Sequence, residues 1–149
     1  MNNTSNLESS KLFDHYIYHA NCTDGLTAVA IAVQPQQETG NIYTTAPMAY
    51  HHKIDVQALA GKSVCFLDFS ASKEVMIDIL EVAERVTVID HHVSIHKELS
   101  EIKHDNFEYI YDVKKSGAGL AWDYFIGTDY PYFVQLVQDR DIWTKKFKD

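Results

Sequence analysis

The sequence predicts an α/β fold with a mostly parallel sheet of about five strands and helices on both faces. Three observations lead to this fold class. Short runs rich in β-branched and aromatic residues alternate with longer stretches of helical periodicity. The run from Ser63 to Leu67 is apolar throughout, which is typical of a parallel strand covered on both faces. Acidic residues and histidines directly follow several runs, at the place where open α/β sheets bind ligands.

The first part of the chain predicts two strands, at His15 to Tyr18 and at Asn41 to Thr45, the second ending near Pro47. A compact apolar helix is expected between them, at Leu26 to Val33. The stretch from Tyr50 to Leu59 is ambiguous and receives no element.

The remainder of the chain predicts three further strands and the helices between them. The strands are expected at Ser63 to Leu67, Arg85 to Ile89 and Phe107 to Tyr111. The helices are expected at Ser72 to Ala83 and at Ser116 to Phe125, each with its serine as N-cap, with a short helix from near Ser94 and a last helix from near Pro131.

Length and composition indicate one domain without a membrane segment. We assign residues 1–12 to a disordered polar tail and residues 13–149 to the domain. The 13 Lys and Arg residues against 21 Asp and Glu residues give a net charge of −8, which argues against a basic groove for long duplex nucleic acid. With two cysteines, no signal peptide and no apolar run of bilayer length, a cytoplasmic protein with no membrane partner is expected.

Three predicted strands lead into groups of metal-binding residue types. The first strand runs into the segment from His19 to Gly25, the third into Asp68, and the fourth into Asp90-His91-His92. Because parallel strands end at one edge of a sheet, these groups are expected to face one another there. Gathered carboxylates repel each other unless cations neutralise them. Imidazole among carboxylates favours a divalent metal, Mn²⁺ ahead of Ca²⁺, with Zn²⁺ as a further candidate.

A purely structural interpretation competes at each position. Asp68 alone is explained equally well as a helix N-cap or turn residue. The triplet that ends in His91 and His92 has no packing reason to follow a buried strand, although a histidine pair also occurs in solvated turns. The pair His51-His52 has no neighbouring acid at a strand end and is assigned to the surface. Cys65, inside an apolar strand, is assigned to the core.

Four motifs in this order resemble those of the DHH phosphoesterase superfamily. They are the segment Ile17 to Gly25, the triplet Asp90-His91-His92, the segment Ser116 to Trp122 and the segment Gln138 to Trp143. They look most like a bacterial and phage branch described as exopolyphosphatase-like. The resemblance implies a DHH-type catalytic domain in which two Mn²⁺ or Mg²⁺ ions activate water for attack on a phosphoester or phosphoanhydride bond.

The resemblance also implies metal ligands. His19 would bind one ion, and Asp68 would bridge both ions. The second ion would be held by three residues: Asp24, His91 and Asp139.

The same resemblance implies catalytic and substrate contacts. His92 would touch the substrate phosphate, and Asp90 would orient the adjacent metal-binding histidine. Backbone amides at Ser116 and Gly117 would add a phosphate contact, with a simple helix N-cap as an equal alternative. Arg140 would be free to approach the phosphate or to pair with an acid.

Two acids compete for the last ligand position. If the last helix continues from Pro131 through Trp143, a spacing of about 100° per residue places Asp141 closer than Asp139 to its apolar face. The family pattern, an acid that follows a short apolar stretch and one small or polar residue, matches Asp139 instead. We expect Asp139, because helices often end or bend where a side chain must reach a metal.

The chain departs from the family pattern at two points. Cys22 stands where many relatives carry an acid, so the first ion is expected to bind weakly, or with a thiolate that favours Zn²⁺ over Mn²⁺. Relatives usually carry a C-terminal companion lobe, so the 149 residues are expected to be either a fragment or a stand-alone catalytic lobe.

The predicted function is metal-dependent hydrolysis of a phosphoester or phosphoanhydride bond. The expected partner is a phosphate-containing small molecule or a short oligonucleotide. Candidate substrates are a short oligonucleotide, a dinucleotide, a nucleoside phosphate and polyphosphate. A homodimer is compatible with the sequence. Two alternatives remain, a metal- or nucleotide-sensing domain without turnover and a structural domain whose polar strand ends bind nothing.

Overall fold

A five-stranded, entirely parallel sheet forms the centre of the protein. The computed structural model describes residues 9–147, and within them the strands follow the order β2-β1-β3-β4-β5. The strands are β1 (His15–His19), β2 (Thr44–Met48), β3 (Ser63–Leu67), β4 (Arg85–Asp90) and β5 (Phe107–Tyr111). The α/β fold class predicted from the sequence is confirmed.

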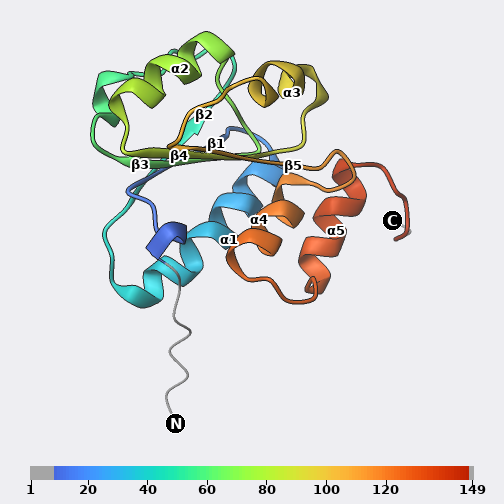
Figure 1. The fold of residues 1–149 in the computed structure, drawn as a ribbon. Coiled ribbons are helices and arrows are strands. Elements are labelled where there is room, and N and C mark those ends of the chain that lie inside the picture. Colours follow the sequence, from blue (N-terminus) through green and yellow to red (C-terminus); the bar gives the residue numbers. More distant parts are fainter. Residues whose placement is uncertain (1–8, 148–149) are drawn as a thin grey trace.

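Helices cover both faces of this sheet (Figure 1). On one face lie α2 (Lys73–Val82) and α3 (Val93–Ser100), and on the other lie α1 (Thr23–Thr39), α4 (Gly117–Phe125) and α5 (Tyr132–Asp141). Two short 3₁₀ turns, η1 (Ser9–Lys11) and η2 (Gln57–Leu59), complete the described elements. Ser72 and Ser116 cap α2 and α4 as expected, each accepting a bond from a first-turn N–H group.

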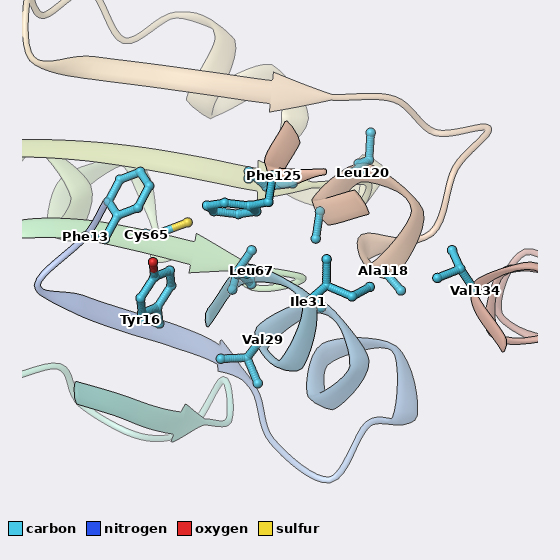
Figure 2. Packing of buried hydrophobic residues seen from close by; sticks show 14 residues of the cluster. Phe13, Tyr16, Val29, Ile31, Cys65, Leu67, Ala118, Leu120, Phe125 and Val134 are labelled. Atoms are coloured by element: carbon cyan, nitrogen blue, oxygen red, sulfur yellow. The ribbon is translucent and has the colours of Figure 1, made fainter. Parts of the chain in front are cut away.

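Each face of the sheet has its own hydrophobic core. Figure 2 shows the core under α1 and α4, where Tyr16 and Leu67 of the sheet meet Ile31 and Phe125 of the helices. The second core joins β3 and β4 to α2 and α3. All five residues of β3 are buried, because this strand has a neighbour on each side and helices above and below. Cys65 is fully buried there, as predicted.

The first helix is longer than predicted, since it continues through Pro35 to Thr39 instead of ending at Val33. Proline in a helix interior removes one backbone hydrogen bond and is normally unfavourable. The next residue, Gln36, compensates with buried contacts: its Oε1 accepts a bond from the backbone N–H of Phe13 at 3.1 Å, and its Nε2 donates to the carbonyl oxygen of Phe13 at 2.7 Å. Tertiary contacts therefore outweigh the local helix propensity.

The second strand lies further along the chain than predicted, at Thr44–Met48 instead of Asn41 to Thr45. It includes Pro47, which was expected near its end. Proline is tolerated there because β2 is an edge strand, where a missing N–H group need not break a ladder.

The disordered tail predicted for residues 1–12 overlaps the described part of the chain at residues 9–12. Residues 1–8 lie outside the described part, whereas Ser9–Lys11 form η1. The guanidinium group of Arg85 donates to the carbonyl oxygens of Ser10 and Leu12 and lies 4.2 Å from the centre of the Phe13 ring. These contacts attach η1 to the start of β4, so the disorder predicted for residues 9–11 is wrong. Within residues 9–147, no helix has both the length and the apolar character needed to cross a membrane.

Candidate metal centre

Asp68 lies at the centre of the candidate site, directly after β3. Its side chain is 1% exposed and its φ is 54°, a left-handed conformation that is uncommon for residues other than glycine. Its Oδ1 lies 3.1 Å from Nε2 of His91, while Oδ2 lies 3.5 Å from Nδ1 of His19 and 3.4 Å from Sγ of Cys22. The two oxygens of this carboxylate therefore face two different groups of side chains.

The first of these groups consists of His19, Cys22 and Asp68. Its ligand atoms all lie within 4.8 Å of one another. The Nδ1 atom of His19 is buried without a hydrogen-bond partner among residues 9–147. Burial raises the pKa of Cys22, and the nearby Asp68 carboxylate adds to this effect, so its thiol is protonated at neutral pH in the absence of a cation.

The second group consists of Asp24, His91 and Asp141, again within 4.8 Å of one another. Nε2 of His91 lies 3.4 Å from Oδ2 of Asp24 and 3.4 Å from Oδ2 of Asp141. Burial alone would lower the pKa of His91, but the hydrogen bond to Asp68 and the three surrounding carboxylates raise it to about 9. Burial, together with the charges of Asp68 and Asp141, raises the pKa of Asp24 to about 7.

Asp24 also closes the beginning of α4. It lies in the first turn of α1, and its carboxylate accepts bonds from the backbone N–H groups of Gly117 at 2.6 Å and Ala118 at 2.7 Å. Gly117 permits this approach, because a Cβ atom there would lie 3.0 Å from Oδ2 of Asp24 and 2.7 Å from Cβ of Asp68. The phosphate contact expected at Ser116 and Gly117 is therefore wrong for this structure, since the Gly117 amide is bound to Asp24. The Ser116 amide is bound to Oε1 of Gln138 at 3.1 Å, and its side chain is buried as an N-cap.

The structure corrects the choice between the two acids of α5. Oδ2 of Asp141 is buried in the cluster and has no hydrogen-bond partner within residues 9–147. Asp139 instead accepts bonds from the hydroxyl of Thr144 and from the backbone N–H groups of Lys146, at 2.6 Å, and Phe147, at 3.2 Å. These donors lower the pKa of Asp139. Asp139 thus holds the segment that follows α5. Asp141 occupies the position in the cluster that was expected for Asp139.

Asp90 positions the second histidine of the triplet. It is fully buried, and its Oδ1 accepts bonds from Nδ1 of His92 at 2.6 Å and from the backbone N–H of His91 at 2.8 Å. Its Oδ2 accepts from the hydroxyl of Ser70 at 3.3 Å. Asp90 was expected to orient the imidazole of His91, but it binds the imidazole of His92. This hydrogen bond raises the pKa of His92.

The structure therefore brings together most of the predicted site. Six predicted residues meet at the carboxyl ends of β1, β3 and β4: His19, Asp24, Asp68, Asp90, His91 and His92. Arg140 is exposed to solvent, so its phosphate contact stays a prediction. His51 and His52 are exposed, as predicted. Tyr50, whose ring lies 5.3 Å from that of His19, stands in a segment without any pattern that indicates a site.

The residues present fit a pair of divalent cations. One set offers nitrogen, sulfur and oxygen and the other offers nitrogen and two carboxylates, with Asp68 facing both. His19 Nδ1 and Asp141 Oδ2 are the kind of atoms that a cation would satisfy, because buried polar atoms normally have partners. A cation would also relieve the repulsion among Asp24, Asp68 and Asp141.

Comparison with known proteins adds one distant relative. No family model matches the sequence. The chain is 31% identical over 145 residues to an uncharacterized protein of Acanthamoeba polyphaga mimivirus. The match covers 89% of this chain and 34% of the viral protein, so the chain spans about a third of that relative's length.

Proposed function

We propose that this chain is a phosphohydrolase of the DHH phosphoesterase type that depends on Mn²⁺ or Mg²⁺. The proposal rests chiefly on one observation: the Asp68 carboxylate faces both His19 and His91 from a buried, left-handed backbone position. A left-handed backbone at a residue other than glycine costs about 1–3 kcal/mol, and residues in this conformation cluster at active sites and ligand clamps. The order of motifs along the sequence supports the same proposal.

Each part of the cluster has a task in this reaction. His19, Cys22 and Asp68 would hold one ion, and Asp24, His91 and Asp141, together with Asp68, would hold the other. When bound, the ions supply positive charge to the phosphate and make water a stronger nucleophile near neutral pH. Binding would displace the proton from His91, because its raised pKa keeps it protonated at pH 7 in the metal-free protein.

His92 is the side chain best placed to contact the substrate. Its Nδ1 is bound to Asp90, which leaves Nε2 as the remaining polar atom of the ring. The raised pKa of His92 favours the protonated imidazolium, which donates a charge-assisted hydrogen bond from Nε2 to a phosphate oxygen. Asp90 fixes the orientation of this ring and remains buried behind it.

Metal-dependent turnover tests the proposal. The purified protein is treated with a chelator, supplied with Mn²⁺ or Mg²⁺, and assayed for release of product from a dinucleotide, a nucleoside phosphate and inorganic tripolyphosphate. We expect Mn²⁺-dependent hydrolysis of at least one of them. The Asp68→Asn variant should lose about 100-fold or more in rate, since it removes the carboxylate shared by the two ligand sets.

Asp78→Asn is the matched control, because Asp78 is an exposed aspartate on α2. This variant should retain full activity. Equal activity of wild type and Asp68→Asn would refute the proposal.

Cys22 favours a second candidate, a metal- or nucleotide-sensing domain without turnover. A neutral thiol is a poorer ligand than a carboxylate for Mn²⁺ or Mg²⁺. A sensing domain would show an increase of the melting temperature with Mn²⁺ but no hydrolysis of any of the three compounds.

A further inference from the structure

A cavity of about 620 Å³ opens beside the metal cluster on the α2 and α3 face of the sheet. Its lining comes from the loops that follow β2 and β3 and from the first turns of α2 and α3, so it lies at the same sheet edge as the cluster. Its volume falls within the range of roughly 300–1,000 Å³ that small-molecule sites occupy. The walls are mostly apolar and include Tyr50, Ile54, Phe69, Val75, Ser94 and Ile95.

Aromatic rings connect this cavity to the cluster. The rings of Tyr50 and Phe69 lie 5.1 Å apart, and both line the cavity. The Tyr50 ring is 5.3 Å from the ring of His19 and 6.4 Å from that of His92. Ser70 also belongs to both regions, because it lines the cavity and donates to Asp90. A molecule with its phosphate near His92 could therefore extend into the cavity across Tyr50.

The lining indicates what such a molecule carries. An inorganic polyphosphate is charged along its whole length and gains nothing from apolar walls. A flat aromatic group gains from stacking on Tyr50, a residue that is 61% exposed and so has surface available. Three serines, Ser70, Ser72 and Ser94, line the cavity among the apolar residues. Ser70 donates its proton to Asp90 and Ser72 accepts the N-cap bond of α2, so Ser70 can still accept a hydrogen bond and Ser72 can still donate one. These groups suit the ring nitrogens and exocyclic groups of a base better than an alkyl chain.

We propose that the Tyr50 cavity binds the nucleobase of a nucleotide whose phosphate lies at the Asp68 cluster. The inference rests on the proposed phosphohydrolase function and narrows its substrates to nucleotides and short oligonucleotides. Lys53, which lines the cavity and is exposed, adds a positive charge at its edge that suits an anionic ligand.

Binding of a fluorescent nucleotide tests the cavity without requiring turnover. The probe is 2-aminopurine riboside 5′-monophosphate in the presence of Mn²⁺, because stacking on an aromatic ring quenches its fluorescence. We expect wild type to quench it at saturation. The Tyr50→Ala variant should bind it roughly 5- to 150-fold more weakly, the range found for removal of one base-stacking ring. Tyr50→Phe, which keeps the ring, should bind within twofold of wild type.

Tyr132→Ala is the matched control, since Tyr132 is 63% exposed and lies on α5 at the opposite face of the sheet. It should bind the probe like wild type. Failure of wild type to bind at millimolar concentration, or equal binding by wild type and Tyr50→Ala, would overturn the inference.

Hydrolysis separates this inference from the proposed function. In Tyr50→Ala, the KM for a dinucleotide should rise by the same factor as the Kd for the probe, while hydrolysis of tripolyphosphate should not change. A protein that hydrolyses tripolyphosphate but shows no effect of Tyr50→Ala on the dinucleotide refutes the base site and keeps the phosphohydrolase. A protein that binds the probe through Tyr50 but hydrolyses none of the compounds keeps the base site and refutes the phosphohydrolase.

Discussion

Two aspartates in the last turn of α5 should respond to substitution in opposite ways. Asp141 contacts His91 within the cluster, whereas Asp139 holds the segment from Thr144 to Phe147. We expect Asp141→Asn to abolish most of the stabilisation by Mn²⁺ with little effect on the metal-free protein. We expect Asp139→Asn to lower the melting temperature of the metal-free protein and to leave the increase caused by Mn²⁺ intact.

The size of the effect follows from mass action. At an Mn²⁺ concentration of about 100 times Kd, binding stabilises the fold by about 2.7 kcal/mol. For a chain of this length, that corresponds to a rise of roughly 5–11 °C in melting temperature. Mutation of groups that only orient metal ligands already weakens affinity by about 10- to 100-fold, so we expect about 100-fold for loss of a direct ligand. At the same Mn²⁺ concentration the Asp141→Asn variant then retains only about 0.4 kcal/mol, or roughly 1–2 °C.

Differential scanning calorimetry at pH 7.5, first with a chelator and then with Mn²⁺, gives the melting temperature of each metal-free variant and its increase on addition of Mn²⁺. In metal-free protein, burial and the charge of Asp68 raise the pKa of Asp141, so removal of its charge should cost little. A full Mn²⁺ response in Asp141→Asn together with a lost response in Asp139→Asn would refute this assignment of the ligands.

Three further predictions concern the cluster. Cys22→Asp should bind Mn²⁺ more tightly in calorimetric titration, because a carboxylate suits this ion better than a thiol; equal or weaker binding would exclude Cys22 from the ligand set. Gly117→Ala should lower both the melting temperature and the Mn²⁺ response, since its Cβ would lie 2.7 Å from Cβ of Asp68; an unchanged response would contradict the close packing. The pKa of Asp24 is raised from 3.8 to about 7 and that of His91 from 6.5 to about 9. Both groups therefore hold their protons more tightly in the folded than in the unfolded chain, and the free energy of unfolding falls as the pH rises through these ranges. The metal-free protein should therefore melt at a lower temperature at pH 9 than at pH 6, and a higher melting temperature at pH 9 would contradict these shifts.

The sheet could be predicted well from the sequence because its strands are short apolar runs with clear ends. The ranges Ser63–Leu67 and Phe107–Tyr111 agree with the structure residue for residue, and β4 is one residue longer than predicted. The errors lie where distant contacts decide. The extension of α1 beyond Pro35 depends on Gln36 and its bonds to Phe13, which no local pattern shows.

Prediction of the site succeeded where strand topology alone brings residues together, as for His19, Asp68 and His91. The prediction of Asp139 as a ligand failed. The helical spacing favoured Asp141, but the position in the family pattern favoured Asp139 and outweighed it. Prediction also failed for the amide of Gly117, because the sequence does not show that a carboxylate from α1 reaches it first.

Asp24 holds the first turn of α4 in addition to the metal-binding role that we propose for it, and this bears on how the fold would change over evolutionary time. Loss of Asp141 would remove charge from a crowded cluster, whereas loss of Asp24 would leave two buried N–H groups of α4 without acceptors. Each such group costs about 1–3 kcal/mol. A lineage that abandoned the site would therefore keep Asp24 long after His91 and Asp141 had drifted. In a diverged homologue, an aspartate at this position would therefore indicate the packing of α4, whereas the residues at positions 91 and 141 would indicate whether the proposed metal site is kept.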